Sequence, residues 1–270
     1  SARKLKQTGA NLLAGRAWVY QLYHFCTNEL GEAFELKHLL EWGGLPEPTL
    51  AEDVLAAREF LNAYVATYLE KEIQQEQWVR NIDPFRRFLA IAAQMNGKII
   101  NKSKIAKEIG INDVTVANYF EILEDTLIGF YLPAYHRSVR KAQKQMPKFY
   151  LIDTGIKRAL ERTLTVELLP QTSAWGEAFE HCVILEFKKG ISYKRLDWEL
   201  YYLQTKDGVE IDLIVLRPGM KKLLIEIKSK TQVLEGDTRS LDTLGSAVDA
   251  KAEMWLLSND PLERNRIHLA

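Results

Sequence analysis

Two apolar runs that also carry charged residues constrain the fold of this chain more than any other feature. The first covers residues 209–215 and the second residues 222–228, and both are rich in Ile, Leu and Val. Runs of this kind, bounded by turn residues, are typical of β-strands. A Pro-Gly pair at positions 218–219 lies between them and favours a turn. The sequence therefore predicts an antiparallel hairpin in this part of the chain.

Charged residues alternate with the aliphatic residues of both predicted strands. Because side chains alternate between the two faces of a strand, Glu210 and Asp212 share one face of the first strand. In the same way, Glu226 and Lys228 share one face of the second strand. A carboxylate among large aliphatic residues is costly to bury without a partner. Two acids and a lysine that converge on one face therefore indicate a metal site with a cationic group beside it.

The length of the connection decides whether the two acids meet. A two-residue turn at 218–219 would pair Asp212 with Ile225 and leave Glu226 on the opposite face. A three-residue connection at 218–220 pairs Asp212 with Glu226. A slip of one residue moves every side chain to the other face. The metal-site interpretation therefore requires the three-residue connection or an equivalent bulge.

The pattern formed by Asp212 and the run Glu226-Ile227-Lys228 resembles the core signature of the PD-(D/E)XK, or restriction-endonuclease-like, nucleases. That family also has an acid on an upstream helix, for which Glu180 is the candidate here. The resemblance implies that Glu180, Asp212 and Glu226 bind Mg²⁺ or Mn²⁺. It also implies that Asp212, Glu226 and Lys228 form a catalytic centre, in which Lys228 orients or activates the attacking water.

The chemistry of magnesium agrees with this interpretation. Mg²⁺ prefers oxygen ligands and keeps several of its waters, and a bound ion can polarise a phosphate and supply hydroxide. A Glu-x-Lys run on a strand is common, however. The alternative of a surface strand that carries paired charges therefore stays open.

An ordered series of short motifs runs along the chain, namely Arg3–Leu5, Leu13–Arg16, Gly43–Glu47, Asp153–Gly155, Gly176–Glu180, Glu210–Asp212 and Glu226–Lys228. The series resembles the C-terminal part of a large group of prokaryotic AAA-type ATPases whose C-terminal domain has no established function. The resemblance implies ATP hydrolysis by a module that lies upstream. This sequence has no G-x-x-x-x-G-K-[ST] phosphate loop, so ATP is expected only in that module. The start at Ser1 instead of Met fits a C-terminal fragment.

Composition and charge set further limits. The chain has 270 residues, of which 47% are hydrophobic and 27% charged, as in ordinary globular proteins. Its formal net charge is zero, so attraction to nucleic acid must come from a local basic patch. The two cysteines have no zinc-site spacing, which favours a reducing, cytoplasmic location. No apolar run is long enough to cross a membrane, so no membrane partner is expected.

The middle of the chain has the pattern of a winged helix-turn-helix. A helix over 102–109 ends at Gly110, a second helix begins at Asn112-Asp113, and a strand over 128–132 is the wing candidate. In DNA-binding proteins the second helix of this motif enters the major groove. Its outward residues here are not basic, and the helix is therefore a poor reader of DNA. These residues are Thr115, Asn118 and Glu121.

The best local basic patch follows the wing candidate. It consists of Arg137, Arg140, Lys141, Lys144 and Lys148. Phosphate contacts from such residues usually dominate affinity for nucleic acid. The sequence therefore predicts that this patch binds nucleic acid, and DNA is favoured over RNA. A solvated basic loop is the alternative.

The last part of the chain is predicted to be a nuclease-like domain. A helix over 174–189 carries Glu180, and strands over 192–195 and 200–204 precede the hairpin. A strand over 254–257 follows a polar, helical stretch. The predicted fold class is α+β, in which a helical region with a winged helix-turn-helix is followed by a restriction-endonuclease-like α/β domain with a mixed central sheet.

The predicted organisation has four parts. They are the end of an AAA-type ATPase module (1–50), a helical linker (51–96), the winged helix-turn-helix (97–147) and the nuclease-like domain (148–270). The predicted function is that of a nucleic-acid-associated C-terminal fragment of an AAA-type ATP-binding protein, with a Mg²⁺-dependent nuclease centre. Nucleic acid and the AAA module are the expected partners, and self-association is left open. The alternatives are a non-catalytic DNA- or protein-binding regulatory module and a stand-alone transcription regulator, which the neutral second helix disfavours.

Overall fold

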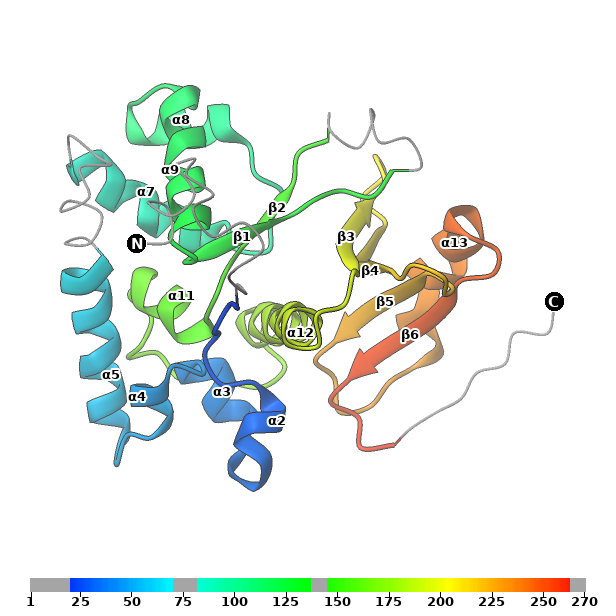
Figure 1. Cartoon of the computed structure of the whole chain (residues 1–270), viewed down its shortest axis with the longest axis horizontal. Helices are drawn as coiled ribbons and strands as arrows, with labels where there is room; N and C mark the ends of the chain where they lie inside the picture. The colour runs from blue at the N-terminus through cyan, green and yellow to red at the C-terminus, as the bar shows by residue number, and fades with distance from the viewer. Residues whose placement is uncertain (1–19, 70–81, 137–144, 263–270) are drawn as a thin grey trace, which may run out of the picture.

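The predicted hairpin forms the centre of a four-stranded mixed sheet (Figure 1). The computed structural model describes residues 20–69, 82–136 and 145–262. The strands, in their order across the sheet, are β3 (Glu199–Gln204), β4 (Glu210–Leu216), β5 (Leu223–Lys228) and β6 (Glu253–Ser258). Neighbouring strands are antiparallel except β5 and β6, which are parallel. The α+β class is confirmed as a mixed chain of helices around this sheet.

The register of β4 against β5 is the one that the metal-site interpretation requires. Leu213 pairs with Ile225. The same register, continued by one residue, places Asp212 opposite Glu226, and residues 217–222 connect the two strands. Gly219 in this connection has φ +75°, in the left-handed region that glycine adopts without strain. Glycine thus allows the tight connection on which the relative placement of the two acids depends.

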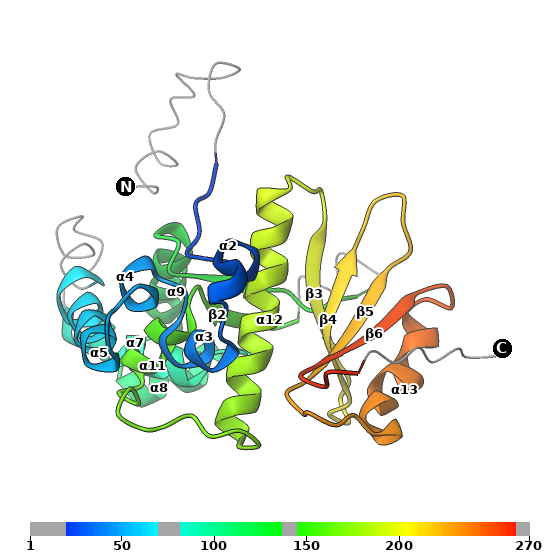
Figure 2. The same cartoon turned by 90° about the horizontal axis from the view of Figure 1, so that it is seen from below.

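Two helices cover the two faces of the sheet (Figure 2). They are α12 (Ser173–Tyr193) and α13 (Arg239–Val248). Helix α12 shares one apolar cluster with Leu213 and Ile225, whereas α13 shares another with Ile214 and Leu224. Because both faces of the central strands are covered, these strands carry nearly continuous apolar sequences.

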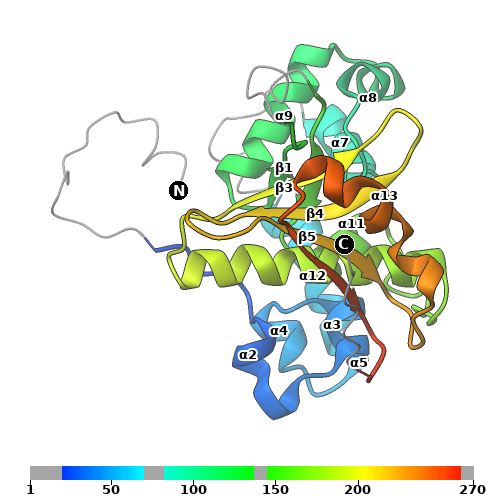
Figure 3. The same cartoon turned by 90° about the vertical axis from the view of Figure 1, so that its right-hand side faces the viewer.

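Helix α12 is longer than the sequence predicts. It continues through Tyr193, so the strand predicted over 192–195 is wrong. Lys189 near the end of the helix is buried and donates a hydrogen bond to the Phe25 carbonyl oxygen (2.8 Å). Figure 3 shows α12 lying between the strands and the N-terminal helices. Contacts on both sides therefore hold the last turns in helical form, which local sequence does not reveal.

Short helices make up most of the remaining described chain. They are α2 (Thr27–Leu30), η1 (Gly31–Ala33), α3 (Leu36–Trp42), α4 (Pro46–Thr49), α5 (Val54–Ala63), η2 (Tyr64–Leu69), α7 (Ile82–Gln94), α8 (Lys102–Ile109), α9 (Asp113–Asp125), α11 (Thr154–Leu160) and η3 (Glu235–Thr238). Among the described residues, no helix combines the length and the apolar character needed to cross a bilayer.

Helices α7, α8 and α9 pack together with a two-stranded sheet. Its strands are β1 (Gly129–Leu132) and β2 (Lys148–Leu151), which run antiparallel. The rings of Phe88, Phe120 and Phe149 pack edge to face in this core, with centroids 4.8 Å apart in each successive pair. The predicted helices and the strand over 128–132 are confirmed here, since Gly110 ends α8 at φ +81° and the Asn112 side chain caps α9.

Asp153 joins the N-terminal helices to α11. Its side chain is fully buried, Oδ1 accepts from the Ile156 N–H (2.9 Å), and Oδ2 accepts from the Gly44 N–H (2.8 Å). The Thr154 hydroxyl donates to the Leu39 carbonyl oxygen (2.6 Å). These bonds satisfy backbone groups that would otherwise be buried without partners. They also bring together two of the segments that carry the AAA resemblance.

We expect Gly155→Ala to destabilise the protein, because a Cβ at this position would lie 2.1 Å from the Trp42 carbonyl oxygen. Overpacking of this kind costs about 1–3 kcal/mol. Gly190→Ala in α12 is the matched control, since a Cβ there meets nothing within 4 Å, and alanine favours a helix by roughly 0.5–1 kcal/mol. Urea unfolding of both variants measures the difference. Equal effects at the two positions would contradict the close approach of α3 to α11.

Candidate carboxylate site

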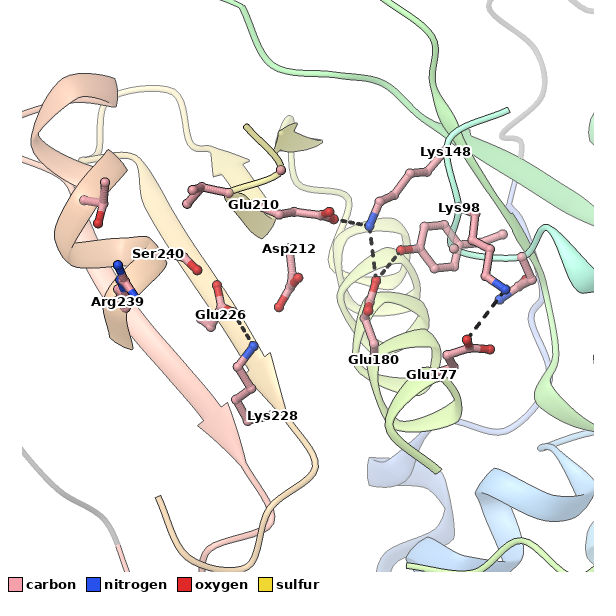
Figure 4. Close-up of a pocket in the computed structure, with 16 residues that line it drawn as sticks. Lys98, Lys148, Glu177, Glu180, Glu210, Asp212, Glu226, Lys228, Arg239 and Ser240 are labelled. Carbon is pink, nitrogen blue, oxygen red and sulfur yellow. Dashed lines mark hydrogen bonds and ion pairs between the residues drawn. The ribbon is translucent and has the colours of Figure 1, made fainter. Parts of the chain in front are cut away.

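A cavity of about 750 Å³ lies at the end of the sheet where β4 begins and β5 ends (Figure 4). Its wall comes from the sheet, from α12 and α13, and from β2 with the segment before α8. Five carboxylates line it, namely Glu177, Glu180, Glu210, Asp212 and Glu226. Four cationic side chains join them, namely Lys98, Lys148, Lys228 and Arg239. The cavity thus combines a dense set of acids with several built-in cations.

Asp212 and Glu226 are the buried pair of this set, at 9% and 3% exposure. Asp212 Oδ2 accepts a hydrogen bond from the Ile227 N–H (2.7 Å), and Glu226 Oε1 accepts one from Lys228 Nζ (2.5 Å). The other Glu226 oxygen, Oε2, is buried and has no hydrogen-bond partner. A buried acceptor without a partner is costly. This oxygen is therefore suited to a ligand that enters the cavity.

Burial raises the pKa of Asp212 to about 8, and repulsion from Glu180 and Glu226 adds to the shift, against the Ile227 N–H and Lys228. Burial also raises the pKa of Glu226, although Lys228 opposes the change. Asp212 therefore holds a proton at pH 7 when no other cation is near. Strongly shifted acids in a cavity are a common mark of functional sites.

Glu180 and Glu210 form a second group with two residues of β2. Lys148 Nζ lies 3.4 Å from Glu180 Oε1 and makes an ion pair with Glu210. The Tyr150 hydroxyl donates to the same Glu180 oxygen (2.7 Å). Donors from β2 thus hold Glu180 on the side of the cavity away from the buried pair (Figure 4).

The structure brings the predicted site residues to one cavity but does not join all the acids. Glu180, Asp212, Glu226 and Lys228 all line it. Within the described ranges, however, no three His, Cys, Asp or Glu side chains are close enough to hold one metal ion together. Asp212 and Glu226 remain a pair, and Mg²⁺ is commonly bound by one or two carboxylates with several waters. The pair and its unpartnered oxygen therefore fit a hydrated divalent cation.

The predicted basic patch has a different outcome. Arg137, Arg140, Lys141 and Lys144 lie outside the described residues. Lys148 is buried inside the cavity, and it therefore differs from the exposed phosphate contact that the sequence indicates. Lys148 lies in the cavity because β2 packs beside α12, and no local sequence pattern predicts this packing.

Sequence reasoning also missed other lining residues. Glu210 had a usable signal, because it shares a strand face with Asp212. Tyr150 and Arg239 had none, since only the packing of β2 and α13 brings them to this cavity.

The shifted pKa of Asp212 gives a prediction about stability. The folded-state pKa of Asp212, about 8, lies above the ordinary value of 3.8. Stability that depends on the protonated group is therefore complete at low pH and is lost as pH rises towards 8. Asp212→Asn removes the charge and keeps an acceptor for Ile227. We expect its urea midpoint in EDTA to exceed that of the wild type by a margin that grows between pH 5 and pH 8.5. Asp207→Asn, at an exposed carboxyl, is the control and should show no such growth.

Comparisons with curated proteins find relatives whose functions are not described. Uncharacterized proteins of Mycobacterium bovis and Mycobacterium tuberculosis are each 26% identical over 210 residues, which is 77% of this chain and 46% of the relative. An uncharacterized protein of Methanocaldococcus jannaschii is 24% identical over 197 residues, 71% of this chain and 41% of the relative. This chain therefore spans less than half the length of these relatives. No solved structure matches significantly.

Two family models match consecutive parts of the chain. Residues 33–167, half of the chain, match a domain of unknown function, DUF8612. Residues 175–268 match a second domain of unknown function, DUF4143, which is typically found in AAA-ATPase-associated proteins. The chain therefore belongs to the DUF8612 family and carries a DUF4143 domain in its C-terminal part.

Proposed function

We propose that the carboxylate cavity binds a divalent cation and cleaves phosphodiester bonds in nucleic acid. One observation carries this proposal. Asp212 and Glu226, from neighbouring strands, line one cavity with Lys228 beside them, and the buried Glu226 Oε2 has no hydrogen-bond partner. Five carboxylates around one cavity are unfavourable without cations, and a divalent cation would relieve their repulsion.

Asp212 and Glu226 are the residues that would hold Mg²⁺ or Mn²⁺. Such an ion polarises a phosphate and lowers the pKa of a bound water. Lys228 contacts Glu226 through its ammonium group, and its side chain lines the cavity and is 34% exposed. That group is placed to orient the attacking water or to balance charge on the phosphate. Binding of a cation would displace the Asp212 proton to solvent, and the resulting carboxylate would help to hold the ion.

We further propose that the chain is the C-terminal part of a longer AAA-type ATP-binding protein. The DUF4143 match and the length of the curated relatives support this proposal. ATP would then be handled by the upstream module. The α8–α9 pair with the β1–β2 ribbon supports a winged helix, and α12 with the β3–β6 sheet supports a nuclease-like domain. Nucleic acid would be bound with help from the basic residues 137–144.

A non-catalytic regulatory module is the second candidate, and a specific observation favours it. Lys148 and Lys228 already pair with three of the cavity acids. A set of acids balanced by internal cations can be purely structural. The face of α9 that bears Thr115, Asn118 and Glu121 also lacks the basic groups that DNA contacts need. A module of this kind would bind another protein.

Calorimetric titration with Mn²⁺ tests the cation site. We expect wild-type protein to release heat on binding and Asp212→Asn to lose that heat, because one of two carboxylate ligands is gone. Glu177→Gln is the control, since Glu177 lies on the same cavity but pairs with Lys98. Equal heats from wild type and Asp212→Asn would rule out the site.

Cleavage of labelled single- and double-stranded DNA and of RNA tests the reaction. We expect Mn²⁺-dependent cleavage by the wild type and a loss of about 10²–10⁴-fold in Lys228→Met if Lys228 aids proton transfer. Lys228→Met should still bind Mn²⁺. Binding of Mn²⁺ by the wild type without any cleavage would favour the non-catalytic module.

A further inference from the structure

The position of Lys148 is the feature of the cavity that the proposed reaction does not use. Lys148 comes from β2, within the region that matches DUF8612, whereas its partners Glu180 and Glu210 belong to the region that matches DUF4143. Its side chain is only 5% exposed. The ring of Tyr202 lies below the ammonium group, 5.4 Å from centroid to Nζ. Two carboxylates and an aromatic face thus surround one cation.

Lys148 remains charged in this environment. Burial lowers its pKa, but attraction to Glu180 and Glu210 outweighs burial, and the pKa rises above the ordinary value. A buried ion pair of this type is tolerated only when each charge has its partners. The Lys148 ammonium group therefore occupies the position beside Glu180 and Glu210 where a divalent cation could otherwise bind these two acids.

Glu180 is held by more than this ion pair. Its Oε1 also accepts the hydrogen bond from Tyr150, two residues along β2. Both donors pull the same oxygen toward β2 and away from Asp212 and Glu226 (Figure 4). This arrangement explains why, in the described part of the chain, the three acids do not form one cluster.

Backbone contacts fix the segment that carries Lys148. Lys148 pairs with Leu132 in β1 and bridges to Ile99 on its other side. The Tyr202 hydroxyl donates to the Met146 carbonyl oxygen (2.5 Å), which attaches the start of β2 to β3 of the large sheet. Lys148 is therefore held in the wall of the cavity by the backbone around it, unlike a side chain on the protein surface.

We propose that Lys148 is a positioning residue that acts as an internal cation, holding Glu180 and Glu210 until a divalent cation competes for Glu180. Lys148 does not contact the substrate in this scheme. It sets the affinity of the site for the cation. Because Lys148 belongs to the region that matches DUF8612, that affinity also depends on this region. The inference rests on the proposed cation site and adds to it a means of control.

Lys148→Met tests the proposal by removing the internal charge at nearly constant length. A unit charge within about 4–6 Å shifts a carboxyl pKa by about 1–3 units, so we expect Mn²⁺ to bind about tenfold more tightly, or better, in calorimetry. In EDTA the same variant should melt at a lower temperature than the wild type, because Glu180 and Glu210 lose their partner. Mn²⁺ should raise its melting temperature more than it raises that of the wild type.

Lys98→Met is the matched control, because Lys98 lies on the same cavity but is half-exposed and pairs with Glu177 at 3.6 Å. It should leave Mn²⁺ affinity and melting close to wild type. If Lys148→Met does not fold, Lys148→Gln makes the same charge change and keeps a donor for Glu180. Wild-type binding with no gain in the Lys148 variant would overturn this inference alone. No Mn²⁺ binding by either protein would overturn the proposed function and this inference together.

Discussion

The pairing of β4 with β5 is the constraint on which both the core and the cavity depend. In the observed register, Leu213 and Ile225 face α12, whereas Asp212 and Glu226 line the cavity. A slip of one residue would move Asp212 and Glu226 to the face that packs on α12, and Leu213 and Ile225 to the face that packs on α13. Burial of two carboxylates in the apolar cluster beside α12 would be costly, and this cost favours the observed register, in which both acids line the cavity. No separate interaction is needed to bring the two carboxylates together.

The cavity is balanced by cations that come from different elements. Lys228 follows Glu226 on its own strand, whereas Lys148 arrives from β2. Asp212 makes no ion pair with another described side chain and instead takes up a proton, since its pKa is raised to about 8. When no metal is bound, a proton on Asp212 and the ammonium groups of Lys148 and Lys228 would balance the charge of the acids. That is the physical reason to expect the cation content of the cavity to respond to pH and to added metal.

The fold could be predicted where the signals are local. Gly110, Asn112 and the Pro-Gly pair at 218–219 mark ends of elements through their own backbone preferences, and the elements beside them were found. The strand predicted over 192–195 was wrong, because contacts of Lys189 with the N-terminal segment keep α12 helical. The alternation of acids with aliphatic residues predicted that Glu226 and Lys228 share a strand face, but only the register of β4 against β5 decides that Asp212 meets them. Glu180 reached the same cavity, but its partners Lys148 and Tyr150 come from about thirty residues upstream in the sequence and could not be inferred from spacing.

The most direct test of the account is a crystal structure of the protein soaked with Mn²⁺, in which anomalous scattering locates the ion. We predict one peak about 2 Å from a carboxylate oxygen of both Asp212 and Glu226. Movement of Glu180 away from Tyr150 toward that peak is the second expected change. A well-ordered crystal with no peak in the cavity, or with a peak bound only by Glu180 and Glu210, would contradict the account.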